Sequence, residues 1–237
     1  MSVAIVVPVH RNAATLTALV QRLEQALNEP WTLRLVIDAC PDGSADVAAQ
    51  LAASDPRVRV THLTSNVGQH QALLRGLIDE QWATAWVVMD ADLQDPPAAV
   101  PTLLVELRDR GVSGVFAGRR GAYESFGRRL TGTVHRRLMA ALSNLPPDAG
   151  AFFAMNTELR DVVVQALREQ GAPSVVAAAG SSAFRLTSVP VVRAVRTQGS
   201  SSWTSLARLR HAARTMVWSA RHRPVPMDAC GNLRPTW

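Results

Sequence analysis

The chain has 237 residues and a mass of 25.6 kDa; 47% of the residues are hydrophobic and 19% are charged. This composition fits one α/β domain or two small ones and excludes wholesale disorder. No run approaches 18 uninterrupted apolar residues, so we expect no membrane-spanning helix, and Met1–Pro8 lacks the basic region of a secretory signal. The two cysteines, Cys40 and Cys230, are too few for a disulfide framework and favour a cytoplasmic location.

The basic residues of the chain are all of one type. The net charge is +6, and all 25 basic residues are arginine. Genomic base composition accounts for such a bias, but fixed guanidinium groups also suit phosphate ligands, anionic lipids or nucleic acid. Charge alone leaves these alternatives open.

The first half of the chain alternates between apolar runs and helical periodicity. Predicted helices cover Asn12–Leu27, Ser44–Ala53, Gly68–Leu77 and the residues from Pro97 to about Arg110. The predicted strands are Val3–Val7, Leu33–Ile37, Val58–Leu63, Ala85–Met89 and Val112–Ala117. Strands separated by helices of this length predict a single α/β domain with a mostly parallel, doubly wound sheet.

The second half is less regular. Two arginine-bearing helices are predicted, over Glu124–Leu142 and Trp203–Ala220. The apolar stripe of the second comprises Trp203, Leu206, Leu209, Ala213, Met216 and Val217. The Pro-rich end reads as a tail, so we expect one domain over 1–223 and a tail over 224–237. The arginines of both helices would suit an anionic membrane surface, or the apolar stripes would simply pack on the sheet.

Polar residues that follow the predicted strands are the candidates for a ligand site, because parallel sheets bind ligands at the carboxyl ends of their strands. His10, Asp38, Asn66 and 90–94 all occupy such positions. Within the last segment, Asp90 and Asp92 could converge on Mg²⁺ or Mn²⁺, with Gln94 adding a neutral oxygen. The alternative is a solvated loop whose aspartates cap the next helix.

The run of residues from Val88 to Pro97 is a more specific signature than a pair of aspartates alone. Val88-Met-Asp-Ala-Asp-Leu-Gln-Asp-Pro-Pro97 resembles the metal-binding segment of family 2 glycosyltransferases, in the polyprenyl-phosphate branch that includes dolichol-phosphate mannose synthase. The other matching segments are Val6–Val9, Asp42–Ser44, Asn66–Leu73, Gly118–Arg120 and Arg196–Trp203. The resemblance covers roughly residues 3–220.

This resemblance implies a GT-A fold and an inverting, metal-dependent transfer from a UDP- or GDP-sugar to a polyprenyl-phosphate acceptor. The implied metal ligands are Asp90, Asp92 and Gln94, with Mg²⁺ or Mn²⁺ as the cofactor. The residues expected at the donor nucleotide are Pro8, Val9, His10, Asp38, Asn66, Gly68, Asp90 and Ala91. Those expected at the acceptor phosphate are Arg120, Arg129, Arg196 and Ser202. Asp92 and Arg120 are also expected to act in catalysis.

The chain departs from the family pattern after the second strand, where Asp38-Ala39 replaces two adjacent aspartates. Membrane-anchored relatives also continue into spanning helices where this chain stops. The enzyme would then be peripheral on the inner face of the membrane, or would use a separate membrane subunit.

Two other acceptors or partners stay open. A soluble hydroxyl acceptor, as in natural-product or surface-glycan biosynthesis, would need a general base, and Asp148 is the candidate. A nonenzymatic arginine-rich module that binds RNA or DNA is a more remote alternative, supported by charge alone. We therefore expect a nucleotide-sugar donor and a lipid-phosphate or small-molecule acceptor, and no nucleic acid.

Overall fold

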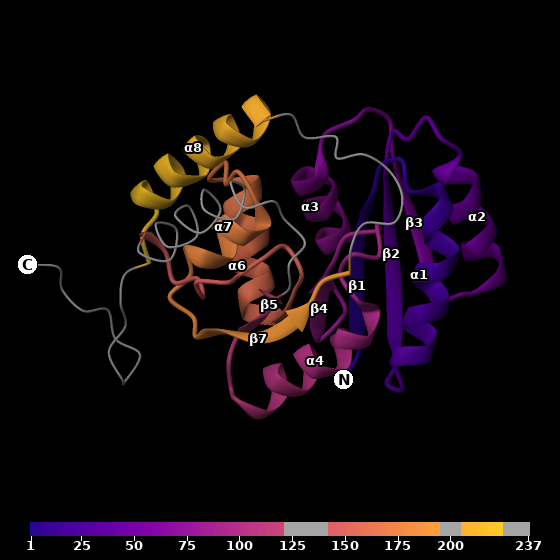
Figure 1. Ribbon diagram of the computed structural model, residues 1–237, viewed down its shortest axis with the longest axis horizontal. Coiled ribbons are helices and arrows are strands. Elements are labelled where there is room, and N and C mark those ends of the chain that lie inside the picture. The colour runs from indigo at the N-terminus through magenta and orange to yellow at the C-terminus, as the bar shows by residue number, and fades with distance from the viewer. Residues whose placement is uncertain (121–141, 195–204, 225–237) are drawn as a thin grey trace, which may run out of the picture.

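The computed structural model describes residues 1–120, 142–194 and 205–224. In this part of the chain seven strands form one sheet in the order β3-β2-β1-β4-β6-β5-β7. The strands are β1 (Val3–Val9), β2 (Trp31–Asp38), β3 (Val58–Leu63), β4 (Ala85–Val88), β5 (Gly114–Arg120), β6 (Phe153–Asn156) and β7 (Leu186–Val192). Helices cover both faces of the sheet (Figure 1). A mixed α/β domain with a doubly wound sheet is thus confirmed.

The direction of the strands follows the prediction with one exception. β3, β2, β1 and β4 pair in parallel, and β7 pairs in parallel with β5. β6 is antiparallel to both β4 and β5, and it was not predicted. With only four residues it carries little periodicity, so its place is set by its neighbours rather than by its own pattern.

The helices are α1 (Ala13–Ala26), α2 (Ser44–Ser54), α3 (Gln69–Asp79), α4 (Val100–Asp109), α6 (Thr157–Arg168), α7 (Val175–Gly180) and α8 (Ser205–Arg221), with a short 3₁₀ turn η1 (Pro97–Ala99) before α4. The four predicted helices of the first half are present. The elements α6, α7 and β7, like β6, have no counterpart among the predicted elements.

β1 shows why the apolar runs are continuous rather than alternating. Val3, Ile5 and Val7 belong to a core shared with α1 and α4, whereas Ala4 and Val6 belong to a second core shared with α3, α6 and α7. Because consecutive side chains of a strand point to opposite faces, a strand covered on both faces must be apolar throughout.

Helix α3 lies unusually close to the sheet. A Cβ atom added at Gly76 would lie 2.4 Å from Val6 Cγ1 and 2.9 Å from Val36 Cγ2. Real Cβ atoms do not approach so closely, so this helix position has room only for glycine. The close packing fixes the axis of α3 and with it the place where the helix begins, at the carboxyl edge of the strands.

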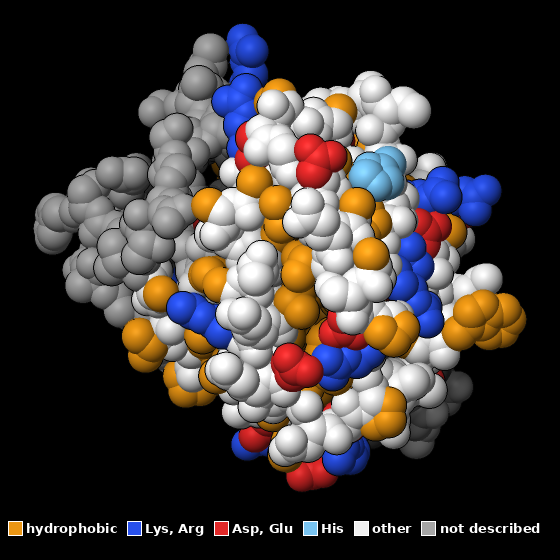
Figure 2. Space-filling model, turned by 90° about the vertical axis from the view of Figure 1, so that its right-hand side faces the viewer, with side chains coloured by type: hydrophobic (Ala, Val, Ile, Leu, Met, Phe, Trp, Pro, Cys, Tyr) orange, Lys and Arg blue, Asp and Glu red, His pale blue; other side chains and the backbone are white. Residues whose placement is uncertain are grey.

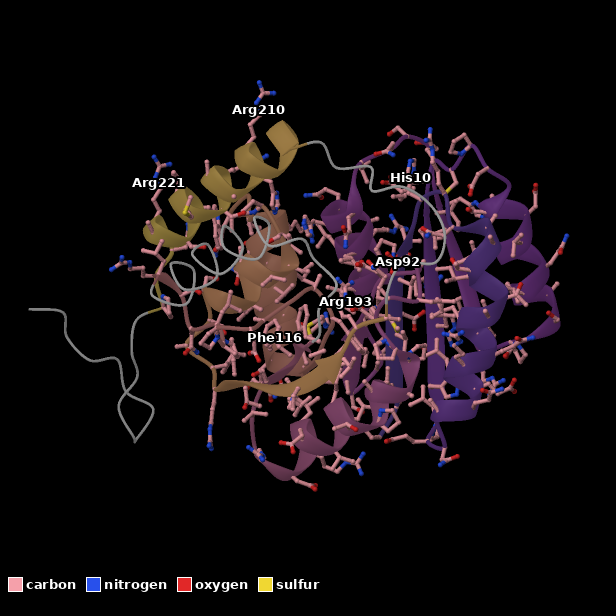
Figure 3. All side chains as sticks on the ribbon, in the orientation of Figure 1. His10, Asp92, Phe116, Arg193, Arg210 and Arg221 are labelled. Carbon is pink, nitrogen blue, oxygen red and sulfur yellow. The ribbon has the colours of Figure 1, made fainter. Side chains whose placement is uncertain are left out.

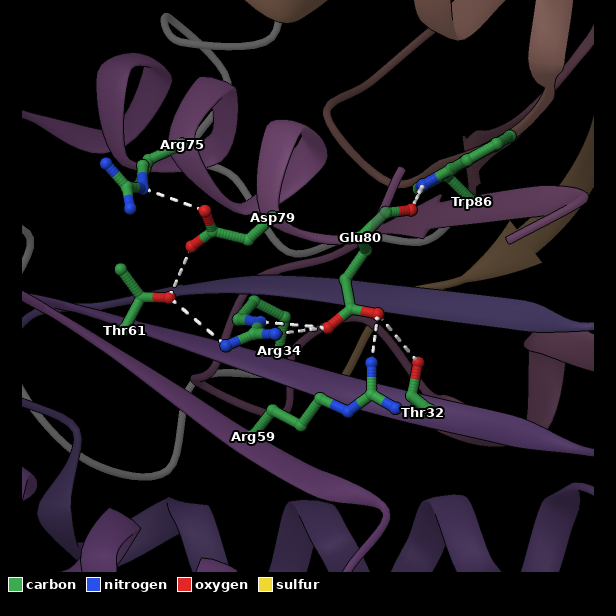
Figure 4. A network of polar contacts seen from close by, with 8 residues as sticks. All are labelled: Thr32, Arg34, Arg59, Thr61, Arg75, Asp79, Glu80 and Trp86. Carbon is green, nitrogen blue, oxygen red and sulfur yellow. Dashed lines mark hydrogen bonds and ion pairs between the residues drawn. The ribbon is translucent and has the colours of Figure 1, made fainter. Parts of the chain in front are cut away.

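A network of polar side chains ties the other end of α3 to β2 and β3 (Figure 4). Glu80 is only 4% exposed and binds Arg34 at 2.6 Å and Arg59 at 2.9 Å. The Nε1 atom of Trp86 donates to the backbone oxygen of Glu80 at 2.9 Å. With partners on both carboxylate oxygens, this buried charge is satisfied.

The face of the molecule on the side of α1 and α2 carries charges of both signs lying next to one another (Figure 2). Arg57 there binds Glu24 and Asp55, both at 2.8 Å, and stacks over Trp31. A hollow of about 490 Å³ beside these residues lies at the amino-terminal edge of the strands. It is thus remote from the predicted ligand site.

The second half corrects one prediction and leaves others outside the described residues. In α8, the predicted stripe is wrong at Ala213 and Val217, which are exposed, whereas Met216 is partly buried on the core; Thr215, Trp218 and Ser219 are also buried. All but the last residue of the predicted helix over 124–142, and all but the first of the predicted tail over 224–237, lie outside the described residues. Among the described helices, none has both the length and the apolar character needed to cross a bilayer.

Candidate active site

The predicted site residues gather at the carboxyl edge of three adjacent strands. β2, β1 and β4 are neighbours in the sheet and run in parallel, so Asp38, Val9 and the segment after Val88 meet at one edge. Figure 3 shows His10 and Asp92 toward this edge, with Arg193 beside Asp92. The topology thus brings together residues from four regions of the chain.

The segment 90–95 turns sharply away from β4. Leu93 has φ +59°, a left-handed conformation that costs energy in a residue other than glycine. The backbone N–H of Gln94 donates to Asp92 Oδ1 at 3.1 Å, which closes the turn. Asp90 Oδ1 in turn accepts a hydrogen bond of 2.8 Å from Gln69 Nε2. Asp90 is thereby tied to the first residue of α3.

The two aspartates and Gln94 suit a hard cation that is shared with a ligand. The described residues hold no group of three or more His, Cys, Asp and Glu side chains that could enclose a metal. Mg²⁺ and Mn²⁺ commonly take one or two carboxylates from the protein and complete their shell with water and substrate phosphates. The donor set present here therefore fits a divalent cation that arrives with, or awaits, a phosphate-bearing ligand.

Asp38 is buried and holds the loop that leads into α3. Its Oδ1 accepts from the N–H of Val67 at 2.7 Å and its Oδ2 from the N–H of Gly68 at 2.9 Å. The residue is only 3% exposed. Gly68 has φ +86°, which glycine adopts without steric cost. The Asp38 carboxylate thus fixes the start of α3, and its contact with a nucleotide stays a prediction.

His10 contacts this loop and is partly exposed. Its Nδ1 atom is 3.0 Å from the backbone oxygen of Asp38 and 3.2 Å from Asn66 Nδ2. Two neighbouring residues share an uncommon backbone conformation, since Arg11 has φ +59° and Ala39 has φ +47°. Together with Leu93, left-handed residues therefore follow all three strands that meet at this edge. Such clusters are typical of ligand sites.

The predicted donor-site residues differ in access. Val9 has no exposed surface, and Asp38 and Ala91 are almost fully buried. The accessible members are Pro8, His10, Asn66, Gly68 and Asp90. A ligand at this edge would contact the accessible residues, while the buried residues hold the accessible ones in place.

The turn Asp42-Gly43-Ser44 after β2 is hydrogen-bonded to the start of α1. Asp42 accepts hydrogen bonds from Ser44 Oγ at 2.6 Å and from the N–H of Ala13 at 3.3 Å. Partial burial acts to raise the pKa of Asp42, but these hydrogen bonds outweigh it and lower the pKa. The carboxylate therefore stays ionised while it caps the start of α1.

Arg193 was not predicted, yet it reaches the centre of the site from the end of β7. Its Nε atom binds Asp95 Oδ1 at 2.6 Å, and a terminal nitrogen lies 3.7 Å from Asp90 Oδ2. Burial acts to lower the pKa of Arg193, but the carboxylates of Asp95, Asp90 and Asp92 raise it above the ordinary value. Gln69 was missed as well, and no spacing in the sequence pairs either residue with Asp90.

The predicted acceptor side is described only in part. Asp148 packs against β5, where a Cβ atom on Gly118 would lie 2.2 Å from Asp148 Oδ2. The backbone of Arg120 ends β5, two residues further along the same strand. The side chain of Arg120 and the whole of Arg129, Arg196 and Ser202 lie outside the described residues, so their roles stay predictions.

The glycosyl transferase family 2 model matches residues 4–162 of the chain. The glycosyltransferase YkcC of Bacillus subtilis is 27% identical over 236 residues, which cover 97% of this chain and 72% of that protein. The undecaprenyl-phosphate 4-deoxy-4-formamido-L-arabinose transferase of Pectobacterium atrosepticum is 28% identical over 212 residues, covering 86% of this chain and 63% of that one. The chain thus spans less than two thirds of this second relative.

Solved structures show the same fold. The mannosyltransferase PcManGT of Pyrobaculum calidifontis, in complex with GDP-Man and Mn²⁺, aligns with a TM-score of 0.61 at 20% identity, covering 92% of this chain and 64% of that one. Glucosyl-3-phosphoglycerate synthase of Mycobacterium tuberculosis aligns with a TM-score of 0.62 at 19% identity, covering 93% and 79%. The sheet and its helices therefore form a GT-A fold, and the chain belongs to glycosyl transferase family 2.

Proposed function

We propose that this glycosyltransferase transfers a sugar, with inversion at the anomeric carbon, from a UDP- or GDP-sugar to a polyprenyl-phosphate acceptor. The observation that carries the proposal is the pair Asp90 and Asp92 at the end of β4, beside the accessible edge formed by β1 and the start of α3. The similarity to undecaprenyl-phosphate transferases supports the choice of acceptor.

Asp90, Asp92 and Gln94 would hold one Mg²⁺ or Mn²⁺. When bound, the cation would offset the negative charge that develops on the nucleoside diphosphate as it leaves. The protein's own part is positioning. Gln69 orients Asp90, and Asp38 holds the loop at Gly68 against the donor edge.

In the transfer itself, the bond between the anomeric carbon and the diphosphate oxygen breaks and a bond to an acceptor oxygen forms. A phosphate monoester already presents an anionic oxygen, so no general base is needed. We propose that Arg120, Arg129 and Arg196, with Ser202, bind this phosphate. Guanidinium groups suit it because they make paired, charge-assisted hydrogen bonds.

A soluble hydroxyl acceptor is the second candidate, and the position of Asp148 favours it. Its carboxylate lies against Gly118 on β5, the strand that ends at Arg120. A hydroxyl nucleophile must lose a proton, and a carboxylate at the acceptor side would take it. This version predicts that transfer depends on Asp148.

For a lipid acceptor, we propose that the enzyme works in the cytoplasm, at the inner face of the membrane. Arg210, Arg214 and Arg221 are exposed on α8, and Figure 3 shows Arg210 and Arg221 pointing away from the body of the molecule. Val217 is exposed among them. A basic face with an apolar residue suits an anionic surface, directly or beside a membrane subunit.

The test is a transfer assay with UDP- and GDP-sugars, in which undecaprenyl phosphate is compared with undecaprenol. The two lipids share the chain and differ only in the phosphate. We expect product with undecaprenyl phosphate alone, and only when Mg²⁺ or Mn²⁺ is present. Equal transfer to undecaprenol would overturn the choice of a phosphate acceptor. Transfer to a soluble alcohol that is lost in Asp148→Asn would replace this proposal with the second candidate.

A further inference from the structure

The end of β7 is joined to the segment 90–95 by contacts from two consecutive residues. Arg193 binds Asp95 at 2.6 Å and lies 3.7 Å from Asp90, and the N–H of Ala194 donates to the backbone oxygen of Gln94 at 2.9 Å. Arg193 and Asp95 are 98 residues apart in the sequence. The contacts are therefore made by the fold and not by local turn geometry.

The pair of Arg193 and Asp95 is buried. The exposed fractions of the two side chains are 10% and 4%. Removing two charges from water costs about as much as their attraction returns, so such a pair adds little stability that apolar residues could not supply. The pair does fix the orientation of the two side chains, because the planar guanidinium group has its donors in a rigid fork.

The Asp90 carboxylate lies between a hydrogen-bond donor, Gln69, and a cation, Arg193. Gln69 Nε2 approaches one oxygen at 2.8 Å from α3, and Arg193 approaches the other at 3.7 Å from β7. Its orientation is thus set from two elements that lie far apart in the sequence. Groups that orient metal ligands in this way commonly change metal affinity by about 10- to 100-fold when they are removed.

We propose that Arg193 is a positioning residue, which holds the segment 90–95 in the conformation that binds a divalent cation and so sets the affinity for that cation. This inference rests on the proposed function. The charge of Arg193 also repels a cation, but Asp95 at 2.6 Å neutralises it directly. We therefore expect the loss of this pair to weaken cation binding.

The experiment measures Mn²⁺ binding to the whole chain by electron paramagnetic resonance, first without a nucleotide and then with UDP or GDP. The variant is Arg193→Met with Asp95→Asn, which removes the pair without leaving one buried charge alone. We expect Mn²⁺ to bind about tenfold more weakly than to the wild-type chain. Arg193→Lys keeps a cation beside Asp95 but lacks the fork that also reaches toward Asp90, and we expect an intermediate affinity.

A second buried ion pair provides the matched control. Arg34 and Glu80 are also 2.6 Å apart, with side-chain exposed fractions of 14% and 4%, and Figure 4 shows them below α3. Their further polar side-chain contacts are with Thr32, Thr61 and Arg59 on β2 and β3. Arg34→Met with Glu80→Gln should lower the melting temperature and leave Mn²⁺ affinity unchanged. If this control changes the melting temperature but not the affinity for Mn²⁺, a loss of stability alone does not weaken Mn²⁺ binding.

The outcomes distinguish this inference from the proposed function. Unchanged or tighter Mn²⁺ binding in the Arg193→Met, Asp95→Asn variant would overturn the inference alone. Equal weakening in the Arg34→Met, Glu80→Gln control would do the same, because it would show a general loss of structure. A wild-type chain that binds no Mn²⁺, either without a nucleotide or with UDP or GDP, would overturn the metal dependence in the proposed function, and the inference with it.

Discussion

The carboxylate of Asp38 accepts a hydrogen bond of 2.9 Å from the backbone N–H of Gly68, which joins the end of β2 to the start of α3. In Asp38→Asn one of the two partly buried N–H groups that the carboxylate binds loses its acceptor. We expect the free energy of unfolding to fall by about 1–3 kcal/mol. Urea denaturation measures this, and Asp46→Asn, a change at an exposed aspartate of α2, is the control. A loss no larger than in the control would contradict the structural role of Asp38.

Much of this edge could be predicted from the sequence because its information is local. Polar residues directly after apolar runs, such as Asp38 and Asp90, must lie at the carboxyl ends of strands once the sheet is parallel. Asp42 was singled out by the family resemblance and not by this rule, and neither predicted its contact with Ala13 at the start of α1.

The rest could not be predicted because it depends on packing between distant parts of the chain. Arg193 follows an edge strand that was not predicted, and its partner Asp95 is fixed only when β7 is placed beside β5. The pattern of α8 was misread in the same way. An apolar stripe alone does not show which side of a helix faces α7, and the structure buries Thr215 and Ser219 while it exposes Val217.

His70 gives the fold a specific response to acid. Its ring stacks on that of His211 in α8, with centroids 5.5 Å apart, and among the described residues its buried Nδ1 has no hydrogen-bond partner. Burial, and then the positive charge that His211 can carry, lower the pKa of His70 to about 4. Between pH 6.5 and 4 the unfolded chain therefore binds a proton there that the folded chain does not.

The stability that depends on His70 is thus intact above pH 6.5 and is lost progressively as the pH falls toward 4. The loss should reach about 3 kcal/mol. His70→Gln should flatten the curve of unfolding free energy against pH in this window, whereas His62→Gln, at an exposed position on β3, should not. Curves of equal slope for wild type and His70→Gln would refute the assignment.

Gly118 and Asp148 should be energetically coupled. A Cβ atom at position 118 would lie 2.2 Å from Asp148 Oδ2, so Gly118→Ala must displace that side chain, at a cost of about 1–3 kcal/mol. In an Asp148→Ala background only the backbone oxygen of Val189, at 3.2 Å, still lies close, so the same change should cost less. Thermal unfolding of the two single variants and the double variant gives the coupling directly. Additive effects would mean that the two residues do not touch.

The arginines of α8 should decide binding to anionic vesicles. Arg210→Glu with Arg214→Glu should reduce sedimentation with phosphatidylglycerol vesicles at low salt by about tenfold or more, because each residue near such a surface contributes about 1 kcal/mol. Arg22→Glu with Arg110→Glu makes the same change in charge on α1 and beside α4, where both residues are exposed. Equal loss in both variants would indicate that net charge, and not the face of α8, determines binding.

The most direct test is the stabilisation of the chain by UDP and GDP, measured by thermal unfolding with Mn²⁺ and with a chelator. A nucleotide at 100 times its dissociation constant should stabilise the fold by about 2.7 kcal/mol. We predict that one of the two nucleotides stabilises the wild-type chain only with Mn²⁺, and that Asp92→Asn loses this effect while it keeps its melting temperature without ligand. Stabilisation that persists in the chelator or in Asp92→Asn would contradict a donor site built on Asp90 and Asp92.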